Sequence, residues 1–352
     1  MRVAIDGRRL QDTPYTGVGR RVANLLPYLA ESVEIVLLTD ARRDSPGLDD
    51  YEEVRLSVPP KLPEPFWLQF SVARWLRHFD GVFHGNYNAV PLFSGARSVV
   101  TLHDLSFEHH REDMSAATAL SFRWAARGSA RRAGAVIAVS EFVRQDIIAT
   151  YDVPPARVLT ARPAIDPLFG PERAEAMGPL RERYGIDGPY VVALGGARRR
   201  GLAVAVEAWR RLPAPDRPML VVVGAEVPPP HKGLVHIGRV PDDEWSAVLA
   251  GATVFCYPTR FEGYGMPASE AAASGVAVVC ARQGPLPEVL GDAAEWCATP
   301  SVEDITAGLA HLLSDDAHRR ALAAAGLARA AAAPGWADCA AVELAAYALA
   351  AS

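Results

Sequence analysis

Lysine is almost absent from this chain of 352 residues: only Lys61 and Lys232 occur, against 34 arginines (36 basic residues minus two). The net charge of −5 shows no basic excess, which argues against a dedicated nucleic-acid-binding protein, because such proteins usually carry a basic domain. Long apolar runs are missing too, since charged residues interrupt them before the roughly 20 residues that a membrane-spanning helix needs. We therefore expect no nucleic-acid partner and no membrane span.

Cysteine is scarce and its spacing is uninformative for metal binding. The four cysteines, Cys256, Cys280, Cys297 and Cys339, form no CxxC pair. This favours reduced, buried thiols of a cytoplasmic enzyme over disulfides or a zinc site. The first residues, Met1–Asp6, reach an acid after a short apolar stretch, unlike a secretory signal peptide.

What the chain does have is a composition and a pattern typical of α/β proteins. Half of its residues are hydrophobic and 22% are charged, as in globular domains, and its length suits two domains of roughly 100–200 residues. In the first part, apolar runs that suit buried parallel strands alternate with segments of helical period. Strands are expected at Val3–Ile5, Glu34–Leu38, Gly81–His84, Ser98–Leu102 and Ala135–Val139, and helices at Gly19–Ala30, Phe66–Arg77, Ala116–Ala133 and Glu141–Thr150, the last with Ser140 as N-cap.

A proline-rich stretch, Arg162–Pro171, interrupts this alternation, which then begins again. The repeat predicts two Rossmann-like domains with doubly wound parallel sheets, facing one another across a cleft at the carboxyl ends of the strands. We expect domains at 1–171 and 172–334 and a C-terminal helix at 335–352. Strands are expected at Tyr190–Leu194, Met219–Val223, Leu234–Ile237, Thr253–Tyr257 and Ala277–Cys280, helices at Leu202–Leu212, Asp243–Ala250 and Pro267–Ser274, and plain helix over the alanine-rich Ala323–Ala351.

The densest group of chemically useful residues is Phe261–Glu270, which follows an expected strand and opens an expected helix. Its glycines let the backbone approach a ligand closely, and the helix start at Pro267 offers N–H groups and a positive dipole end to a phosphate. Glu262 and Glu270 could each hold a different hydroxyl group. The alternative is a glycine-rich turn in which Glu270 only favours the helix dipole.

This segment resembles the Glu-x7-Glu signature of the retaining glycosyltransferases of family 4, also called group 1, which have the GT-B fold. Other segments resemble the same family in the same order: Tyr15–Arg20, Val100–Leu105, Ala138–Phe142, Val235–Pro241 and Leu286–Val289. Phe66-Trp67 and Phe83–Gly85 are similar to its mannosyltransferase-like branch, which builds polysaccharides. The resemblance covers nearly the whole chain and implies a final helix, after Trp336, that crosses back onto the first domain.

The resemblance implies a nucleotide-sugar donor, with GDP-mannose favoured by the branch. Glu270 would accept hydrogen bonds from the ribose, and Glu262 would lie beside the transferred sugar; we expect neither in the core. The remaining donor-binding residues implied by the family are Gly17 and Gly19 facing the pyrophosphate, Arg239 and Val240 bordering the base, and Gly263, Tyr264, Gly265 and Met266 holding sugar hydroxyls and the distal phosphate.

His103 stands where the family has a histidine near the reacting carbon. A lone histidine at a strand end is otherwise most often a structural, hydrogen-bonded residue. Asp104, which follows it, is as readily explained as a turn or helix cap.

The phosphate-binding segment departs from the family, which commonly has an Arg-Lys pair after the first strand of the second domain. Counting back from Glu207–Trp209 places Arg199 at the arginine position and Arg200 at the lysine position. A guanidinium is a planar fork and an ammonium a compact point charge, so the two are not equivalent. The alternative is that Arg198–Arg200 is a solvated run of charge.

The implied reaction moves a sugar from its nucleotide to a saccharide, lipid-linked or small-molecule acceptor with retained configuration and no metal, because no DxD-like pair follows a strand at the right place. Arg199, Arg200 and the helix start at Pro267 would stabilise the leaving phosphate. The favoured account is front-face attack with that phosphate as base; a covalent bond to Glu262 is the weaker option. A non-catalytic nucleotide-sugar-binding protein and a GT-B epimerase are the alternatives.

Basic and aromatic residues gather in Lys61–Phe79. They could contact a membrane surface, which would make the cytoplasmic protein peripheral at the inner membrane face. The simpler interpretation is a helix that packs its tryptophans inward.

Overall fold

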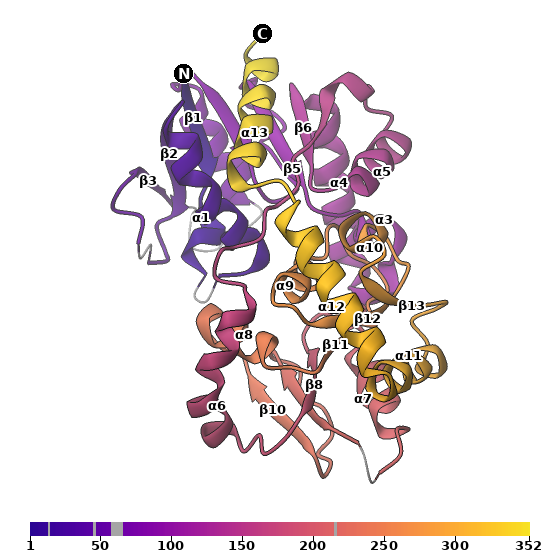
Figure 1. The fold of residues 1–352 in the computed structure, drawn as a ribbon. Coiled ribbons are helices and arrows are strands. Elements are labelled where there is room, and N and C mark those ends of the chain that lie inside the picture. Colours follow the sequence, from indigo (N-terminus) through magenta and orange to yellow (C-terminus); the bar gives the residue numbers. More distant parts are fainter. Residues whose placement is uncertain (13–14, 45–46, 58–65, 215–216) are drawn as a thin grey trace. The chain divides into compact units, whose positions relative to one another are not determined.

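The computed structural model describes residues 1–12, 15–44, 47–57, 66–214 and 217–352. They form two compact units (Figure 1): unit 1 comprises residues 1–164 and 334–352, and unit 2 comprises residues 165–333. Residues 165–171, expected in the first domain, thus lie in unit 2, and the C-terminal residues lie in unit 1.

Unit 1 is built on a parallel sheet whose described strands follow the order β3-β2-β1-β4-β5-β6-β7. The central strands are apolar and buried along their length, as runs between two helical layers must be. The strands are β1 (Arg2–Asp6), β2 (Glu34–Asp40), β3 (Glu52–Leu56), β4 (Val82–Gly85), β5 (Ser98–Leu102), β6 (Ala135–Ala138) and β7 (Val158–Thr160).

The helices of unit 1 cover this sheet, and the one that follows Ser140 is capped as the sequence predicts. Ser140 accepts a hydrogen bond from the Val143 backbone N–H and so begins α5. The helices are α1 (Gly17–Ala30), the π-helix η2 (Trp67–Val72), α2 (Ala73–Leu76), α3 (Ser106–His109), α4 (Ala116–Arg132), α5 (Glu141–Tyr151) and α13 (Trp336–Ala351), with short 3-10 turns at η1 (Arg8–Gln11), η3 (Arg111–Asp113) and η4 (Pro155–Arg157).

Unit 2 repeats the architecture with the described strand order β10-β9-β8-β11-β12-β13. Its strands are β8 (Tyr190–Leu194), β9 (Met219–Val223), β10 (Leu234–Gly238), β11 (Val254–Cys256), β12 (Ala277–Ala281) and β13 (Ala294–Cys297). Its helices are α6 (Met177–Tyr184), α7 (Leu202–Arg210), α8 (Asp242–Ala250), α9 (Met266–Ala273), α10 (Leu286–Leu290), α11 (Val302–Ser314) and α12 (Asp316–Ala331), with 3-10 turns at η5 (Pro171–Ala176) and η6 (Arg198–Arg200). The prediction of two doubly wound parallel sheets is confirmed.

Two sequence expectations about helices are wrong in detail. The alanine-rich tail is two helices rather than one, because α12 ends at Ala331 and Pro334-Gly335 separate it from α13. Proline cannot continue the helical hydrogen bonding and glycine favours its end. The helix expected at Phe66–Arg77 begins as the π-helix η2 before α2 continues it.

A buried polar chain ties α13 to α1 and the sheet of unit 1. Arg21 of α1 pairs with Glu343 of α13 at 2.8 Å, and each side chain is 1% exposed. Tyr347 donates to Glu343 (3.1 Å), so its oxygen must accept from His84 Nδ1 (2.8 Å). His84 Nε2 is then the acceptor for the Thr101 hydroxyl, at 2.8 Å. Because the Glu343 carboxylate can only accept, it fixes the direction of all three hydrogen bonds, from Tyr347 through His84 to Thr101 on β5.

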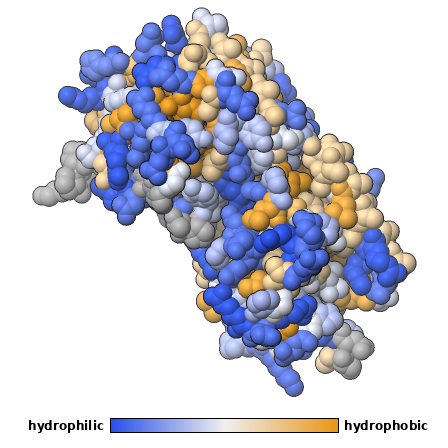
Figure 2. All heavy atoms as spheres, turned by 60° about the vertical axis from the view of Figure 1, so that its left-hand side comes forward, coloured by the Kyte–Doolittle hydropathy of each residue, from blue (hydrophilic) through white to orange (hydrophobic). Residues whose placement is uncertain are grey.

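The surface, the helices and the cysteines of the structure agree with what the composition predicts. On the face shown in Figure 2, hydrophilic residues are interspersed with hydrophobic ones. Among the described residues, no helix combines the length and the apolar character that crossing a membrane would require. All four cysteines are free and buried.

Candidate active site

Glu262 lies in the loop between β11 and α9, where two hydroxyl groups surround one of its oxygens. The Tyr257 hydroxyl donates to Oε1 at 2.5 Å, and Thr259 Oγ1 lies 3.3 Å from the same atom. Burial and the Glu262 charge raise the pKa of Tyr257 well above its usual value, so it remains a donor. The other oxygen, Oε2, lies 4.0 Å from the guanidinium of Arg199.

The loop after β8 is locked against the Glu262 loop by backbone contacts. The Arg260 N–H donates to the Arg199 carbonyl oxygen at 2.8 Å. Gly201 has a φ of 72°, and a Cβ there would overlap the Pro258 carbonyl oxygen, so only glycine allows this approach. Arg199 and Arg200 are half-buried and only Arg198 is exposed, unlike a uniformly solvated run of charge.

Glu270 is held in the first turns of α9 by an aromatic donor. The indole N–H of Trp245, on α8, donates to Glu270 Oε2 at 2.9 Å. Gly265 begins the helix with a φ of 94°, and Pro267 lies in its first turn, as expected. Gly263 and Gly265 are buried, and Tyr264 and Met266 are half-buried beside the helix start.

The expectation that neither glutamate lies in the core is wrong, since Glu262 is 7% exposed and Glu270 is 4% exposed. Both are buried because neighbouring hydroxyl and indole groups satisfy them. Sequence reasoning missed Tyr257, Thr259 and Trp245; the signal available was the aromatic and hydroxyl residues just before Glu262, whereas nothing in the sequence pairs Trp245 with Glu270.

The carboxyl edge of the unit 2 sheet is lined by glycine. Gly224, with a φ of 126°, passes so close to the Gly195 carbonyl oxygen that no Cβ fits. Gly238 ends β10 with a φ of 72°. Arg239 follows it and is exposed, while Val240 is buried in the core of the unit. This edge offers open backbone next to the residues expected to border a base.

His103 follows β5 in unit 1 and is held in one tautomer. Its Nε2 lies 2.8 Å from the Asn86 carbonyl oxygen, which can only accept, so Nε2 carries the proton. Its backbone N–H donates to Asn88 Oδ1 at 3.0 Å. Burial and then the charge of Arg21 lower the pKa of His103 to about 4, so the ring is neutral near pH 7. Among the described residues nothing hydrogen-bonds to Nδ1, which is left as an acceptor for a ligand.

Asp104 and the two glycines of the first loop have local structural roles. Asp104 Oδ1 accepts from the backbone N–H and the hydroxyl of Ser106, at 2.9 and 2.6 Å, and so caps the turn into α3. Gly17 begins α1 and is exposed. Gly19 is buried, and a Cβ there would overlap the Arg9 carbonyl oxygen.

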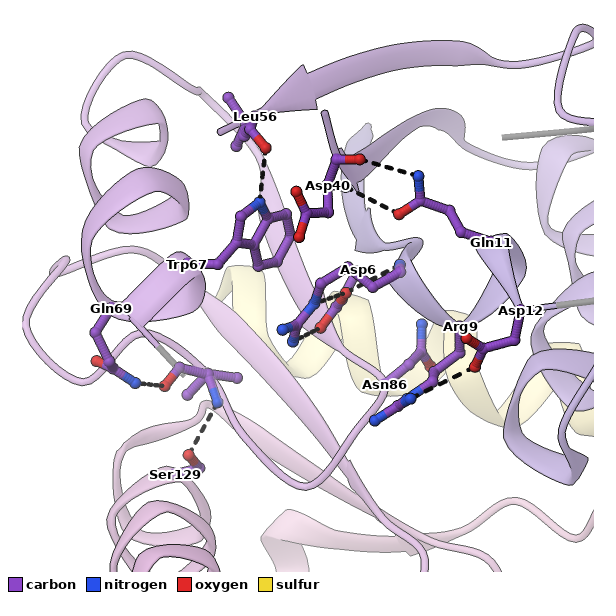
Figure 3. A network of polar contacts seen from close by, with 12 residues as sticks. Asp6, Arg9, Gln11, Asp12, Asp40, Leu56, Trp67, Gln69, Asn86 and Ser129 are labelled. Atoms are coloured by element: carbon purple, nitrogen blue, oxygen red, sulfur yellow. Dashed lines mark hydrogen bonds and ion pairs between the residues drawn. The ribbon is translucent and has the colours of Figure 1, made fainter. Parts of the chain in front are cut away.

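Polar side chains gather where β1 and β2 of unit 1 end (Figure 3). Gln11 and the backbone of Asp40 exchange two hydrogen bonds, of 3.0 and 3.1 Å. An open hollow of about 340 Å³ lies here, and three arginines and two aspartates line it: Arg9, Arg42, Arg43, Asp12 and Asp40. The charges nearly balance, so the hollow suits a polar, hydroxyl-rich ligand.

The expected site residues therefore divide between the units. Unit 1 holds Gly17, Gly19 and His103, and unit 2 holds the rest. Within unit 2 the structure brings Glu262 next to Arg199.

Comparison with known proteins shows a two-part match along the chain. Residues 15–168 match Glycosyltransferase Family 4, and residues 181–329 match Glycosyl transferases group 1. An O-antigen chain mannosyltransferase B of Escherichia coli is 29% identical over 71% of this chain and 70% of its own length. An MMP alpha-(1->4)-mannosyltransferase of Mycolicibacterium hassiacum is 29% identical over 85% of this chain and 78% of its own.

Solved structures share the fold at low identity. A sucrose-phosphate synthase from Thermosynechococcus elongatus superimposes with a TM-score of 0.79 at 17% identity, over 99% of this chain and 98% of that one. HepE from Anabaena, solved with UDP-glucose, gives 0.72 at 16% identity, over 94% and 95%. With both family models matched in order on two parallel-sheet units, the chain belongs to the family 4 glycosyltransferases of the GT-B fold and is similar to the mannosyltransferases among them.

Proposed function

We propose that this glycosyltransferase moves a mannose-like sugar from a nucleoside-diphosphate donor to a saccharide, lipid-linked or small-molecule acceptor, with retained anomeric configuration and without a metal ion. The observation that carries the proposal is the Glu262 loop, in which a carboxylate with one oxygen held by Tyr257 has its other oxygen next to Arg199. A prepositioned carboxylate beside a cation suits a sugar whose leaving group is anionic.

The charge that grows on the leaving phosphate would be stabilised by fixed groups of unit 2. Arg199 and Arg200 supply two guanidinium groups, which can donate hydrogen bonds to phosphate oxygens. The start of α9 adds backbone N–H groups and the positive end of a helix dipole. These groups need no reorganisation when the glycosidic bond breaks, since Gly201 and the Arg260–Arg199 hydrogen bond already hold the loops together.

Donor binding would use the other carboxylate. Trp245 donates to one oxygen of Glu270 and so fixes the carboxylate in the first turns of α9, where it would accept hydrogen bonds from the hydroxyl groups of a ribose. Gly238, where a Cβ would meet nothing within 4 Å, leaves the sheet edge open for a flat base. The names of the mannosyltransferase relatives support a mannose donor, and GDP as its nucleotide is our proposal from the resemblance of the sequence to that branch. HepE was solved with UDP-glucose, so the donor assay below decides between the two nucleotides.

In unit 1, Nδ1 of neutral His103 would accept a hydrogen bond from a sugar hydroxyl, because Nε2 already donates to the Asn86 carbonyl oxygen. The hollow lined by Arg9 and Asp12 is the place we propose for acceptor hydroxyl groups.

Trp67 is buried and donates to the Leu56 carbonyl oxygen, as the inward-packing interpretation predicts. Phe70, however, is 58% exposed, and we retain a peripheral membrane contact for a lipid-linked acceptor. Lys61 lies outside the described residues.

The test is turnover of purified protein with GDP-mannose, GDP-glucose, UDP-glucose and dTDP-glucose, each with and without acceptor, in the presence of EDTA. Nucleotide release that depends on acceptor is expected for GDP-mannose, with an α-linked product identified by the one-bond carbon–proton NMR coupling at the anomeric carbon. A changed sugar without acceptor would identify an epimerase, and binding without turnover would identify a non-catalytic protein. Turnover with UDP- or dTDP-sugars alone would exclude the GDP donor.

A further inference from the structure

Three metal-ligating side chains converge on the surface of unit 2, outside the candidate active site. Glu295 of β13, His311 of α11 and His318 of α12 each offer one ligand atom, and these atoms all lie within 4.8 Å of one another. They come from three different elements. We propose that these residues form a binding site for a divalent transition-metal ion such as Zn²⁺.

The local structure directs both histidine rings at one carboxylate. His311 Nδ1 lies 2.9 Å from Glu295 Oε1, and His318 Nε2 lies 2.8 Å from Oε2. The two imidazole rings are stacked, with centroids 4.6 Å apart and an angle of 21° between their planes. Without a metal, each facing nitrogen carries a proton that the carboxylate accepts. A dication bound there would take the place of those two protons, each of which would move to the other nitrogen of its ring or, where the ring is cationic, be released to solvent.

The backbone fixes the positions of the three ligands. His311 lies in the last turn of α11, and His318 lies in the first turn of α12. Asp315 separates the two helices and accepts a hydrogen bond from the His318 N–H at 2.9 Å. Glu295 lies on β13, which pairs with β12 along its length. Because the three ligand atoms already lie within 4.8 Å of one another, we expect side-chain rotation to bring them to about 2.0–2.2 Å from one ion.

The ligand chemistry selects the class of ion. Imidazole nitrogen with a carboxylate oxygen suits Zn²⁺, Co²⁺, Ni²⁺ and Cu²⁺, whereas Mg²⁺ and Ca²⁺ prefer oxygen alone. The half-exposed site leaves room for water in the fourth position: the His311 side chain is 50% exposed and that of Glu295 is 18% exposed. The site shares no residue with the Glu262 loop, so the ion would join β13 to α11 and α12 and take no part in sugar transfer.

The test is calorimetric titration of Zn²⁺ into the metal-stripped full-length chain at pH 7.5, with any polyhistidine tag removed. One ion per chain is expected, together with a rise in melting temperature of about 5 °C, because only the folded chain brings the three ligands together. Visible absorption with Co²⁺ in place of Zn²⁺ should show nitrogen ligands. The four buried cysteines should not compete in the folded state.

Matched variants decide whether the ion occupies this cluster. His318→Gln and Glu295→Gln should each weaken Zn²⁺ binding by roughly tenfold or more, about 1.4 kcal/mol or more. His109→Gln is the control: His109 also pairs with a carboxylate, Asp146, at 2.9 Å, but in the part of the chain that the structure describes this pair belongs to no group of three metal-ligating side chains. This variant should bind Zn²⁺ as the wild type does. Undiminished binding in the double variant His311→Gln/His318→Gln, or no binding by the wild type, would overturn the proposal.

Discussion

The two signature glutamates differ in the groups that hold them, which predicts different roles. Glu262 has one oxygen taken by Tyr257 and the other facing Arg199, whereas Glu270 is held by Trp245 within a helix. Since both are buried, a glutamine that keeps the shape is a cleaner probe than alanine, which would leave Trp245 without its acceptor.

We predict that Glu262→Gln lowers kcat by roughly 10²–10³-fold, as when other electrostatic contacts to a transition state are lost. Glu270→Gln should raise the donor KM more than it lowers kcat, because the ribose is bound equally in the ground and transition states. Steady-state kinetics at saturating acceptor, with urea unfolding as the control for folding, measure both. Equal losses of kcat in the two variants would show that the roles are assigned wrongly.

The sequence predicted these glutamates but not their surroundings. The Glu-x7-Glu spacing is local and can be seen in the chain itself. The Trp245–Glu270 hydrogen bond joins α8 to α9, and the His103 tautomer depends on a carbonyl group at Asn86. Such partners are set by tertiary packing, which no local pattern encodes.

The buried His84 makes the stability of unit 1 depend on pH. Burial lowers the pKa of His84 to about 4, against an ordinary value of 6.5, although nearby Glu343 opposes the shift. The folded state therefore binds fewer protons than the unfolded state between pH 6.5 and 4. Stability is fully present above pH 6.5 and falls on acidification by up to about 1.4 kcal/mol per pH unit for each such histidine. His103, lowered to about 4, adds to the same window.

We predict that His84→Gln unfolds at a lower urea concentration at pH 7 but loses less stability between pH 7 and pH 5 than the wild type does. Burial raises the pKa of Glu343, but Arg21 outweighs burial and lowers it below the ordinary value of 4.5. The stability that Glu343 contributes is therefore lost only below pH 4.5, outside the range from pH 7 to pH 5. Urea unfolding at a series of pH values is the measurement. An unchanged pH slope in the variant would contradict the role of His84.

At the scale of elements, the strands that the sequence missed are all at sheet edges. β3 and β7 are the outer strands of the unit 1 sheet, and β13 is an outer strand of the unit 2 sheet. The sequence Glu52–Leu56 is largely charged and only half-buried, because an edge strand has one open side. The central strands were predicted since they are buried on both faces and read as continuous apolar runs.

The contact between the β8–α7 loop and the β11–α9 loop is also testable. Gly201→Ala should lower kcat by more than roughly tenfold, because the added Cβ overlaps the Pro258 carbonyl oxygen and moves Arg199 away from Glu262. Gly185→Ala is the matched control: its φ is 67°, close to the 72° of Gly201, but a Cβ there meets nothing within 4 Å. Equal activity losses in the two variants would mean that backbone strain, and not the loop contact, is responsible.

At the scale of the molecule, the arrangement of cations predicts how nucleotide binding responds to metal removal. GDP should raise the melting temperature in the presence of EDTA, since ligand binding stabilises the folded state and the arginines supply the charge that a metal would otherwise bring. The His318→Gln variant should behave identically, which separates the donor site from the proposed zinc site. A shift that appears only with added Mg²⁺ or Mn²⁺ would contradict metal-free binding.

The return of α13 to unit 1 has a consequence for synthesis on the ribosome. Unit 2 is one continuous segment, 165–333, and can complete its core before residues 334–352 emerge. Unit 1 cannot, because Arg21 lacks Glu343 and His84 lacks Tyr347 until α13 arrives. The part of the chain that is translated first is therefore the part that completes its fold last, because Arg21 and His84 gain these partners only when α13 has been synthesised.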